Sequence, residues 1–300
     1  MRVVSALGLG ALAALSGCQR LLSIEDPVAG ETVRDAALDS PADAPPDAEE
    51  PCPVIRPPGS PLLLSEIVLA PDPGEMIEIV NTSADDVDLA TYYLSDSGTY
   101  YRMPLDKTVD NFDFIVKFPD GAHLAGHGVA TVAIATAASF NTNYGMMPMY
   151  SVTDRTMVSI GMTGTPQLTN GGEPIILFQW DGQSDLVRDV DIMLAGVPSA
   201  SNPLPSKSNV ALDGPDADAQ TSQYAVDLGS IRAQPSAPGS GVSTKRLLLE
   251  GRHEHHDGTG NGTAGDDETS EDTAATWDGT TKAFSAPTPG QVPPQLVRCP

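Results

Sequence analysis

From about residue 60 onward, short apolar stretches alternate with Gly, Pro, Asn and Asp, and this pattern restricts the chain to strand-based folds. Residues 76–80 and 187–193 alternate apolar and polar side chains, the period of a strand with one buried face. No long apolar repeat of helical period is present. The expected strands are residues 62–69, 76–80, 87–94, 114–118, 128–135, 175–180 and 187–193. Short strands separated by turn signals predict an all-β fold, a β-sandwich.

The segments around these strands differ in composition. Residues 196–241 and 251–283 are rich in Gly, Pro, Ser, Thr and Asp, so we expect long loops there. Residues 18–58 are dominated by Ala, Pro, Asp and Glu and carry few large apolar side chains. Proline and acidic self-repulsion extend such a chain, which predicts a disordered tether. The expected organisation is therefore a leader at 1–17, an acidic tether at 18–58 and a sandwich domain at 59–300.

The leader has the parts of a secretory signal: Arg2, an apolar run at 6–15, and small residues before Cys18. The run of about ten residues is half of what a membrane-spanning helix needs. No longer apolar run follows. The sequence Leu15-Ser16-Gly17-Cys18 resembles the lipobox of bacterial lipoproteins. It predicts cleavage before Cys18 and a lipid anchor on that cysteine.

A lipid on Cys18 would attach the protein to a membrane, so a membrane is one expected partner. A single acyl chain binds membranes only marginally, and lipoproteins resembling this one carry two or three. Gln19 follows the cysteine, and in Gram-negative sorting a residue other than aspartate there favours the outer membrane. The expected location is the cell envelope, anchored by lipid at the outer membrane, on its periplasmic face or at the cell surface.

With Cys18 assigned to lipid, Cys52 and Cys299 remain as an even pair in an oxidising compartment. They lie at the two edges of the globular part, and we expect a disulfide between them. In the chain-entropy model such a long loop contributes at most about 5 kcal/mol. The alternative is two free, buried thiols.

The charge balance narrows the classes of partner. The chain has 40 acidic and 16 basic residues, a formal net charge of −24 and a pI of about 4.2. Nucleic-acid binding depends on Lys and Arg that neutralise phosphates, so no nucleic-acid partner is expected. The same charge keeps an exported domain soluble and favours binding of cations.

Several motifs occur in an order that resembles the lamin tail domain. They are SEI at 65–67, EMIEIVN at 75–81, VDLATYYLSD at 87–96, LAGHG at 124–128, LTNGGEPIIL at 168–177 and FSAPTPG at 284–290. The resemblance covers roughly residues 61–291. Ala90 stands where the family has Gly, Tyr92 and Tyr93 where it has Trp, and Gly126 precedes His127 rather than following Pro. The resemblance implies an immunoglobulin-like β-sandwich used as a binding or surface module, without a shared catalytic site.

Residues 257–268 contain a partial calcium-loop pattern. Asp257, Asn261, Gly262 and Glu268 fill positions 1, 5, 6 and 12 of the template, whereas Thr259 at position 3 is a poorer ligand. No helices are expected on either side, so this is not an EF-hand. The hypothesis is a calcium site formed by Asp257, Asn261 and Glu268, and the alternative is a solvated acidic loop. A second acidic turn, 213–218, could contribute oxygens.

Three histidines, His253, His255 and His256, lie next to one another with Glu254. Histidine and carboxylate ligands suit transition metals. However, adjacent ligands in a polar loop are more often solvated, and the His-Glu-x-x-His helix motif is absent. Gly-x-Ser-x-Gly, P-loop and dinucleotide-binding patterns are absent as well.

These observations favour a non-enzymatic, membrane-anchored envelope or cell-surface lipoprotein whose lamin-tail-like domain mediates binding or structural interactions. The first alternative is a calcium-dependent adhesion or glycan-binding module that uses the 257–268 loop. The second alternative is a metal-dependent hydrolase that uses His253, His255 or His256. The leading interpretation requires no cofactor, the first alternative requires calcium, and the second requires a transition metal.

Overall fold

The computed structural model describes residues 59–196, 205–228, 236–250 and 253–297. These residues belong to one compact unit, Glu49–Pro300. The predicted lipidation site at Cys18 and the predicted disulfide between Cys52 and Cys299 lie outside the described residues, as do the leader and the tether. Those predictions therefore stay predictions.

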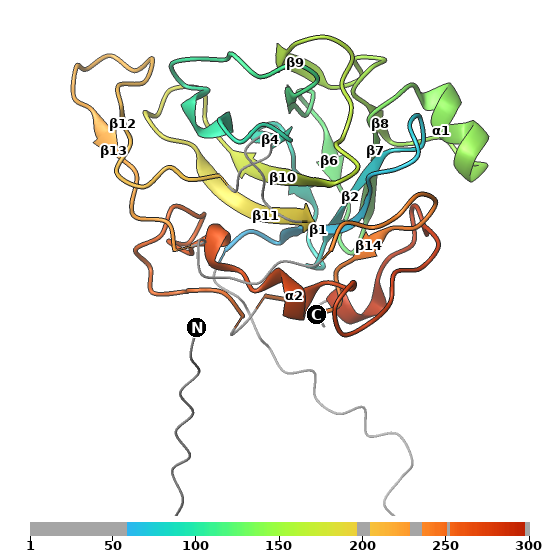
Figure 1. The fold of residues 1–300 in the computed structure, drawn as a ribbon. Coiled ribbons are helices and arrows are strands. Elements are labelled where there is room, and N and C mark those ends of the chain that lie inside the picture. The colour runs from blue at the N-terminus through green and yellow to red at the C-terminus, as the bar shows by residue number, and fades with distance from the viewer. Residues whose placement is uncertain (1–58, 197–204, 229–235, 251–252, 298–300) are drawn as a thin grey trace, which may run out of the picture. The chain divides into compact units, whose positions relative to one another are not determined.

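Two five-stranded sheets form the framework (Figure 1). The first has the order β14-β1-β2-β7-β8, with bounds Thr244–Lys245, Leu62–Val68, Met76–Asn81, Val129–Ala133 and Tyr150–Ser151. The second has the order β11-β10-β4-β5-β9, with bounds Arg188–Gly196, Gly172–Gln179, Tyr92–Ser95, Phe114–Lys117 and Val158–Met162. Within these two sheets, neighbouring strands are antiparallel except for β7 and β8.

The remaining elements are short. Two small sheets pair β3 (Val87–Asp88) with β6 (His123–Leu124) and β12 (Ala211–Leu212) with β13 (Ser222–Gln223). The helices are η1 (Tyr100–Arg102), α1 (Ala137–Tyr144), η4 (Glu268–Ser270), α2 (Thr273–Thr276) and η5 (Pro294–Leu296). No helix in the described part of the chain combines the length and the apolar character needed to cross a bilayer. The prediction of an all-β fold is confirmed.

The sheets pack face to face around the main core. Leu64 and Ile79 of the first sheet share one buried cluster with Leu94, Val116 and Leu177 of the second. This is the arrangement of a β-sandwich, in which the two inner faces together exclude water. Burial of this apolar surface is the main favourable term for the fold.

A second core covers the outer face of the second sheet. Tyr93 and Phe178 stack there, with ring centroids 5.2 Å apart, beneath Tyr100 and Tyr224. These covering residues come from η1 and from the segment of β12 and β13, part of the predicted 196–241 loop. Because both faces of the sheet are covered, β10 is buried almost throughout instead of alternating.

The prediction of one continuous strand at residues 87–94 is wrong, because two separate strands occupy this range. Leu89 to Thr91 form a break, so that β3 pairs with β6 while β4 joins the second sheet. The helix α1 was not predicted either, because its 8 residues are too few to show a clear helical repeat of apolar side chains. The Oγ1 of Thr136 caps its first turn by accepting a bond from the Ser139 amide, and Gly145 ends it with φ of 71°.

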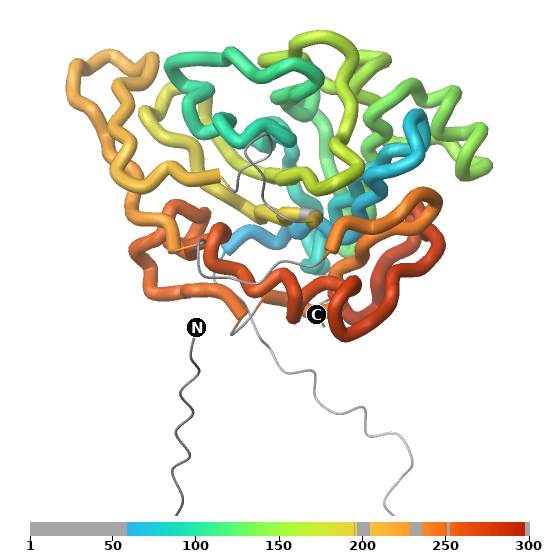
Figure 2. The backbone as a smooth tube through the Cα atoms, viewed as in Figure 1, coloured from blue at the N-terminus to red at the C-terminus, as the bar shows by residue number. Residues whose placement is uncertain are grey.

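The C-terminal segment, residues 236–250 and 253–297, runs along one side of the sandwich as a largely irregular chain (Figure 2, orange to red). The predicted 251–283 loop lies within it. The chain there is largely irregular, as expected of a loop, but Glu268, Ser270 and Trp277 within it are buried. This segment therefore carries charged side chains into the interior.

Side chains from the sequence motifs at 65–67, 75–81 and 284–290 fasten this segment to the first sheet. Glu66 accepts bonds from the amide and the hydroxyl of Thr288, each 2.9 Å long. Glu78, opposite Glu66 in the sheet, accepts a bond of 2.7 Å from the Gly290 amide. Motif residues from both ends of the domain therefore contact one another, and these contacts stabilise the fold.

Candidate metal centre

The site begins on β11, where two aspartates are separated by a β-bulge. Asp191 pairs with Leu177, which faces the main core, whereas Asp189 pairs with Phe178, which faces the outer core. The bulge inserts Val190 between them, so the two carboxylates point to opposite faces although they are two residues apart. Asp191 consequently points between the sheets and is fully buried.

Arg246, directly after β14, is the basic partner of Asp191. Its Nη2 lies 2.6 Å from both carboxylate oxygens, and its Nε donates to the Leu64 carbonyl at 2.8 Å. Nη1 donates to Glu271 at 2.8 Å, and the guanidinium lies 4.8 Å from the Trp277 ring centroid. The Leu64 amide donates to Asp191 at 2.6 Å. This pair therefore joins β1, β11 and the C-terminal segment.

Further carboxylates gather beside this pair. One oxygen each from Asp191, Glu250 and Glu268 lies within 4.8 Å of the other two, and all three side chains are buried. Glu254 is also buried and raises the pKa of Glu268 through charge repulsion, second only to the effect of burial. We call Asp191, Glu250, Glu254 and Glu268 the acidic centre.

Several oxygens of the acidic centre accept no hydrogen bond from any described residue. They are Oε2 of Glu268 and both carboxylate oxygens of Glu254. His256 stands at the edge of the centre, with Nε2 3.5 Å from Glu254 and Nδ1 2.9 Å from Asp266. Glu268 is only 4% exposed, so bulk solvent hydrates its carboxylate little. A buried carboxylate without donors or a cation is strongly unfavourable in its charged form.

The pKa shifts express the same excess of negative charge. Burial, followed by repulsion from Glu250 and Glu271, raises the pKa of Glu254 to about 11. Burial also raises the pKa of Glu268 well above its usual range. Burial opposes the charged form of Arg246, but Asp191, Glu271 and Glu250 outweigh this and raise its pKa. One guanidinium is thus shared among more carboxylates than it can neutralise.

A neighbouring buried network is balanced by contrast. Lys207 Nζ lies 2.6 Å from Asp189 and 3.1 Å from Asp227, while Tyr100 donates to Asp189 at 2.5 Å. Asn261 donates to Asp227 at 2.7 Å. Each carboxylate here has a cationic or hydroxyl donor, so this network is explained by stability alone.

The residues predicted to bind calcium from the sequence do not come together. The Asp257 side chain is 47% exposed and accepts bonds from the amide and hydroxyl of Thr259. Asn261 is bonded to Asp227 and to the backbone of Ala225. Only Glu268 enters a group of buried carboxylates.

The histidine cluster is divided in the same way. His255 Nδ1 lies 3.5 Å from the exposed Asp257, whereas His256 faces Glu254 and Asp266. His253 is partly buried, and its amide donates to the Glu250 carbonyl. In the second acidic turn, Asp213 and Asp216 come together with Asp185.

Sequence reasoning missed Asp191 and Glu250, and it noted Glu254 only as the carboxylate beside the three histidines. The alternation around Asp191 suggested a polar, outward face, and only the bulge and the opposing sheet turn that side chain inward. Glu250 precedes the histidine cluster and Glu254 lies within it, four residues further on, where both resembled ordinary loop charges. The sequence feature that could have indicated a buried charge network is Arg246, a basic residue in a segment dominated by acidic residues.

Comparisons with known proteins leave the family open. No family model matches the sequence, and no curated protein matches it. A solved structure of a DUF4876 family protein from Bacteroides thetaiotaomicron VPI-5482 resembles 79% of this chain over 75% of its own length. The identity is 14% and the TM-score 0.42, a likeness too slight to support any argument about function.

Proposed function

We propose that this chain is a non-enzymatic, lipid-anchored envelope protein whose lamin-tail-like β-sandwich binds calcium in the acidic centre. The calcium site is supported by one observation, the buried carboxylates of Asp191, Glu250, Glu254 and Glu268. Four carboxylates face the single positive charge of Arg246. The ion supports a binding or structural role of the sandwich by keeping its edge closed. The anchor at Cys18 rests on the sequence.

The donor set favours calcium over a transition metal. Calcium takes 6–8 oxygen ligands at about 2.4 Å, so oxygens on opposite sides of the ion lie about 4.8 Å apart. The three oxygens of Asp191, Glu250 and Glu268 fall within this span. Zinc and copper prefer imidazole and thiolate, and of the histidines only His256 approaches the centre.

The position of the ligands indicates what the ion does. Asp191 belongs to the edge strand β11, Glu250 follows β14, and Glu268 begins η4. An ion held by all three fastens the C-terminal segment across the open edge between the two sheets. Binding of an ion to the folded state alone stabilises that state by about 2.7 kcal/mol at a hundred times its Kd.

The test is a calcium titration of chelator-treated, purified protein by isothermal calorimetry, with melting temperatures in chelator and in excess calcium. We expect saturable binding and a rise of about 5 °C or more. Glu268→Gln should remove the binding at this centre, whereas the matched Asp257→Asn should keep it. Binding that survives Glu268→Gln but is lost in Asp257→Asn would place the ion in the exposed loop instead.

The anchor needs a separate test. Wild-type protein and Cys18→Ala are compared for fatty-acid labelling and for distribution between inner membrane, outer membrane and soluble fractions. We expect the wild type to be labelled and membrane-bound, and the variant to be neither. A variant that still partitions into membranes without label would refute lipid anchoring while leaving the calcium site untouched.

A further inference from the structure

A second group of carboxylates lies at one end of the second sheet. Asp96 follows β4, Asp113 precedes β5, and Glu173 lies near the start of β10. These three strands are neighbours in the sheet and antiparallel, so these termini meet at the same end. One oxygen from each side chain lies within 4.8 Å of the other two.

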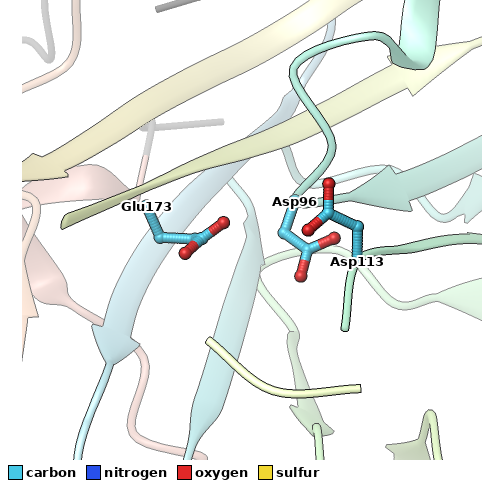
Figure 3. A group of neighbouring side chains, drawn as sticks. All are labelled: Asp96, Asp113 and Glu173. Atoms are coloured by element: carbon cyan, nitrogen blue, oxygen red, sulfur yellow. The ribbon is translucent and has the colours of Figure 1, made fainter. Parts of the chain in front are cut away.

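Figure 3 shows the carboxylates of Asp96 and Asp113 side by side, with the carboxylate of Glu173 directed toward them. The hydrogen bonds to this group occupy only part of its oxygens. Asp96 Oδ1 accepts from the Phe114 amide at 2.7 Å, and Glu173 Oε2 accepts from the Thr169 amide at 2.7 Å. These bonds fix the side chains in place.

Asp96 provides a second, independent observation. It is 1% exposed, and its Oδ2 accepts no hydrogen bond from any residue that the structure describes. No basic side chain in the described ranges forms an ion pair with it. A fully buried carboxylate oxygen of this kind requires a cation or a proton.

We propose that Asp96, Asp113 and Glu173 form a second calcium site, separate from the acidic centre and sharing no residue with it. All three donors are carboxylates, the ligands of a hard divalent cation. Asp113 is only half-buried, so this side of the site is open to water, which supplies the remaining ligands.

The electrostatics agree with this geometry. Burial, followed by the charge of Asp113, raises the pKa of Asp96 well above its usual range. Burial raises the pKa of Glu173 to about 7 and that of Asp113 to about 6. A bound cation would lower all three pKa values and so stabilise the charged forms.

The site would also hold in place the part of the fold that covers the second sheet. The chain between Asp96 and Asp113 carries η1, whose Tyr100 and Tyr101 close the outer core. A cation that holds both ends of this chain stabilises the cover of the second sheet. Loss of the ion should therefore loosen the 97–112 segment first.

The experiment counts bound calcium in the purified full-length protein by calorimetry after chelator treatment. We expect two ions per chain, of which Asp96→Asn removes one and Glu268→Gln removes the other. Asp110→Asn is the matched control, since it neutralises an exposed aspartate of the same segment and should keep both ions. If Asp96→Asn does not fold, Asp113→Asn at the partly buried position replaces it, with folding checked by circular dichroism.

The outcomes separate this site from the acidic centre. A single ion lost in Glu268→Gln and retained in Asp96→Asn and Asp113→Asn would overturn the second site and leave the first intact. A single ion lost in Asp96→Asn alone would support the second site and overturn the first. Hydrogen exchange of residues 97–112 should rise on calcium removal in the wild type, and an unchanged rate would contradict the proposed stabilisation.

Discussion

Arg246 and Asp191 are both fully buried, and Nη2 of the arginine lies 2.6 Å from each oxygen of the aspartate. The pair spans the open edge of the sandwich, because Asp191 lies on β11 while Arg246 extends the pairing of β14 with β1. Taking both charges out of water is costly, and their mutual contact, the bonds to Leu64 and the bond from Arg246 to Glu271 offset that cost. The stability of the domain should therefore depend strongly on this contact.

Replacing Arg246 by Met should destabilise the domain by about 3–5 kcal/mol, because Asp191 and Glu271 are left as uncompensated buried charges. Urea unfolding in chelator measures the change. The control is Lys117→Ala, which breaks a surface ion pair of 2.8 Å with Asp120. That change should cost no more than about 1 kcal/mol. Equal effects of the two substitutions would contradict the role assigned to Arg246.

Replacing Glu254 by Gln should reduce the stabilisation that calcium provides. Glutamine keeps the volume of the side chain and resembles the protonated form that the raised pKa of Glu254 favours in chelator, so stability there should be no lower than in the wild type. The increment on calcium addition should shrink, because a ligand of the ion is weakened. Paired thermal melts measure both quantities. An undiminished calcium increment would exclude Glu254 from the site.

Glu78 predicts a pH dependence that Glu78→Gln removes. Burial, and then the charge of Glu66, raise the pKa of Glu78 to about 8, while the Gly290 amide, the Ser65 hydroxyl and Lys245 oppose the shift. The folded state therefore binds the proton more tightly than the unfolded chain, whose value is 4.5. The stability from this group is complete below pH 4.5 and is lost as the pH rises toward about 8.

The measurement is urea unfolding of wild type and Glu78→Gln between pH 4.5 and 8, in chelator. The wild type should lose up to about 1.4 kcal/mol per pH unit more than the variant in this window. Parallel stability curves for the two proteins would show that Glu78 does not titrate as expected.

Replacing Thr288 by Val should cost about 1.5 kcal/mol or more, because the Thr288 hydroxyl donates to the buried carboxylate of Glu66 at 2.9 Å. Valine preserves the shape of the side chain and the amide bond. The matched control is Thr142→Val in α1, whose exposed hydroxyl donates only to the Ala138 carbonyl. If both variants unfold at the wild-type urea midpoint, the Thr288 contact contributes nothing to stability.

The sequence pattern predicted most of the long strands correctly, because the apolar residues that a strand buries are visible in its own sequence. The expected strand at 62–69 corresponds to β1, and that at 175–180 falls largely within β10. The strand expected at 87–94 was split because the break at Leu89 to Thr91 depends on which sheet each half joins. Local propensity carries no information on that choice.

The two candidate sites show the same division. Glu268 stood out in the sequence as one acidic residue of a glycine-rich loop, and the structure places it in the acidic centre. Its partners did not stand out, because Asp191 is turned inward by a bulge that the sequence pattern does not reveal. Asp96, Asp113 and Glu173 belong to three separate strand ends, which only the pairing of β4, β5 and β10 brings together.

What the sequence by itself determined is the all-β class, the segments that form most of the long strands, and the excess of acidic residues that favours cations. It also yields the predictions of a lipid anchor at Cys18 and a disulfide between Cys52 and Cys299. What only the tertiary structure decided is which carboxylates are buried together. Strand periodicity is a local property of the chain, whereas the dehydration of a charge depends on residues far away in sequence. The contact between Arg246 and Asp191, 55 residues apart, is such a case.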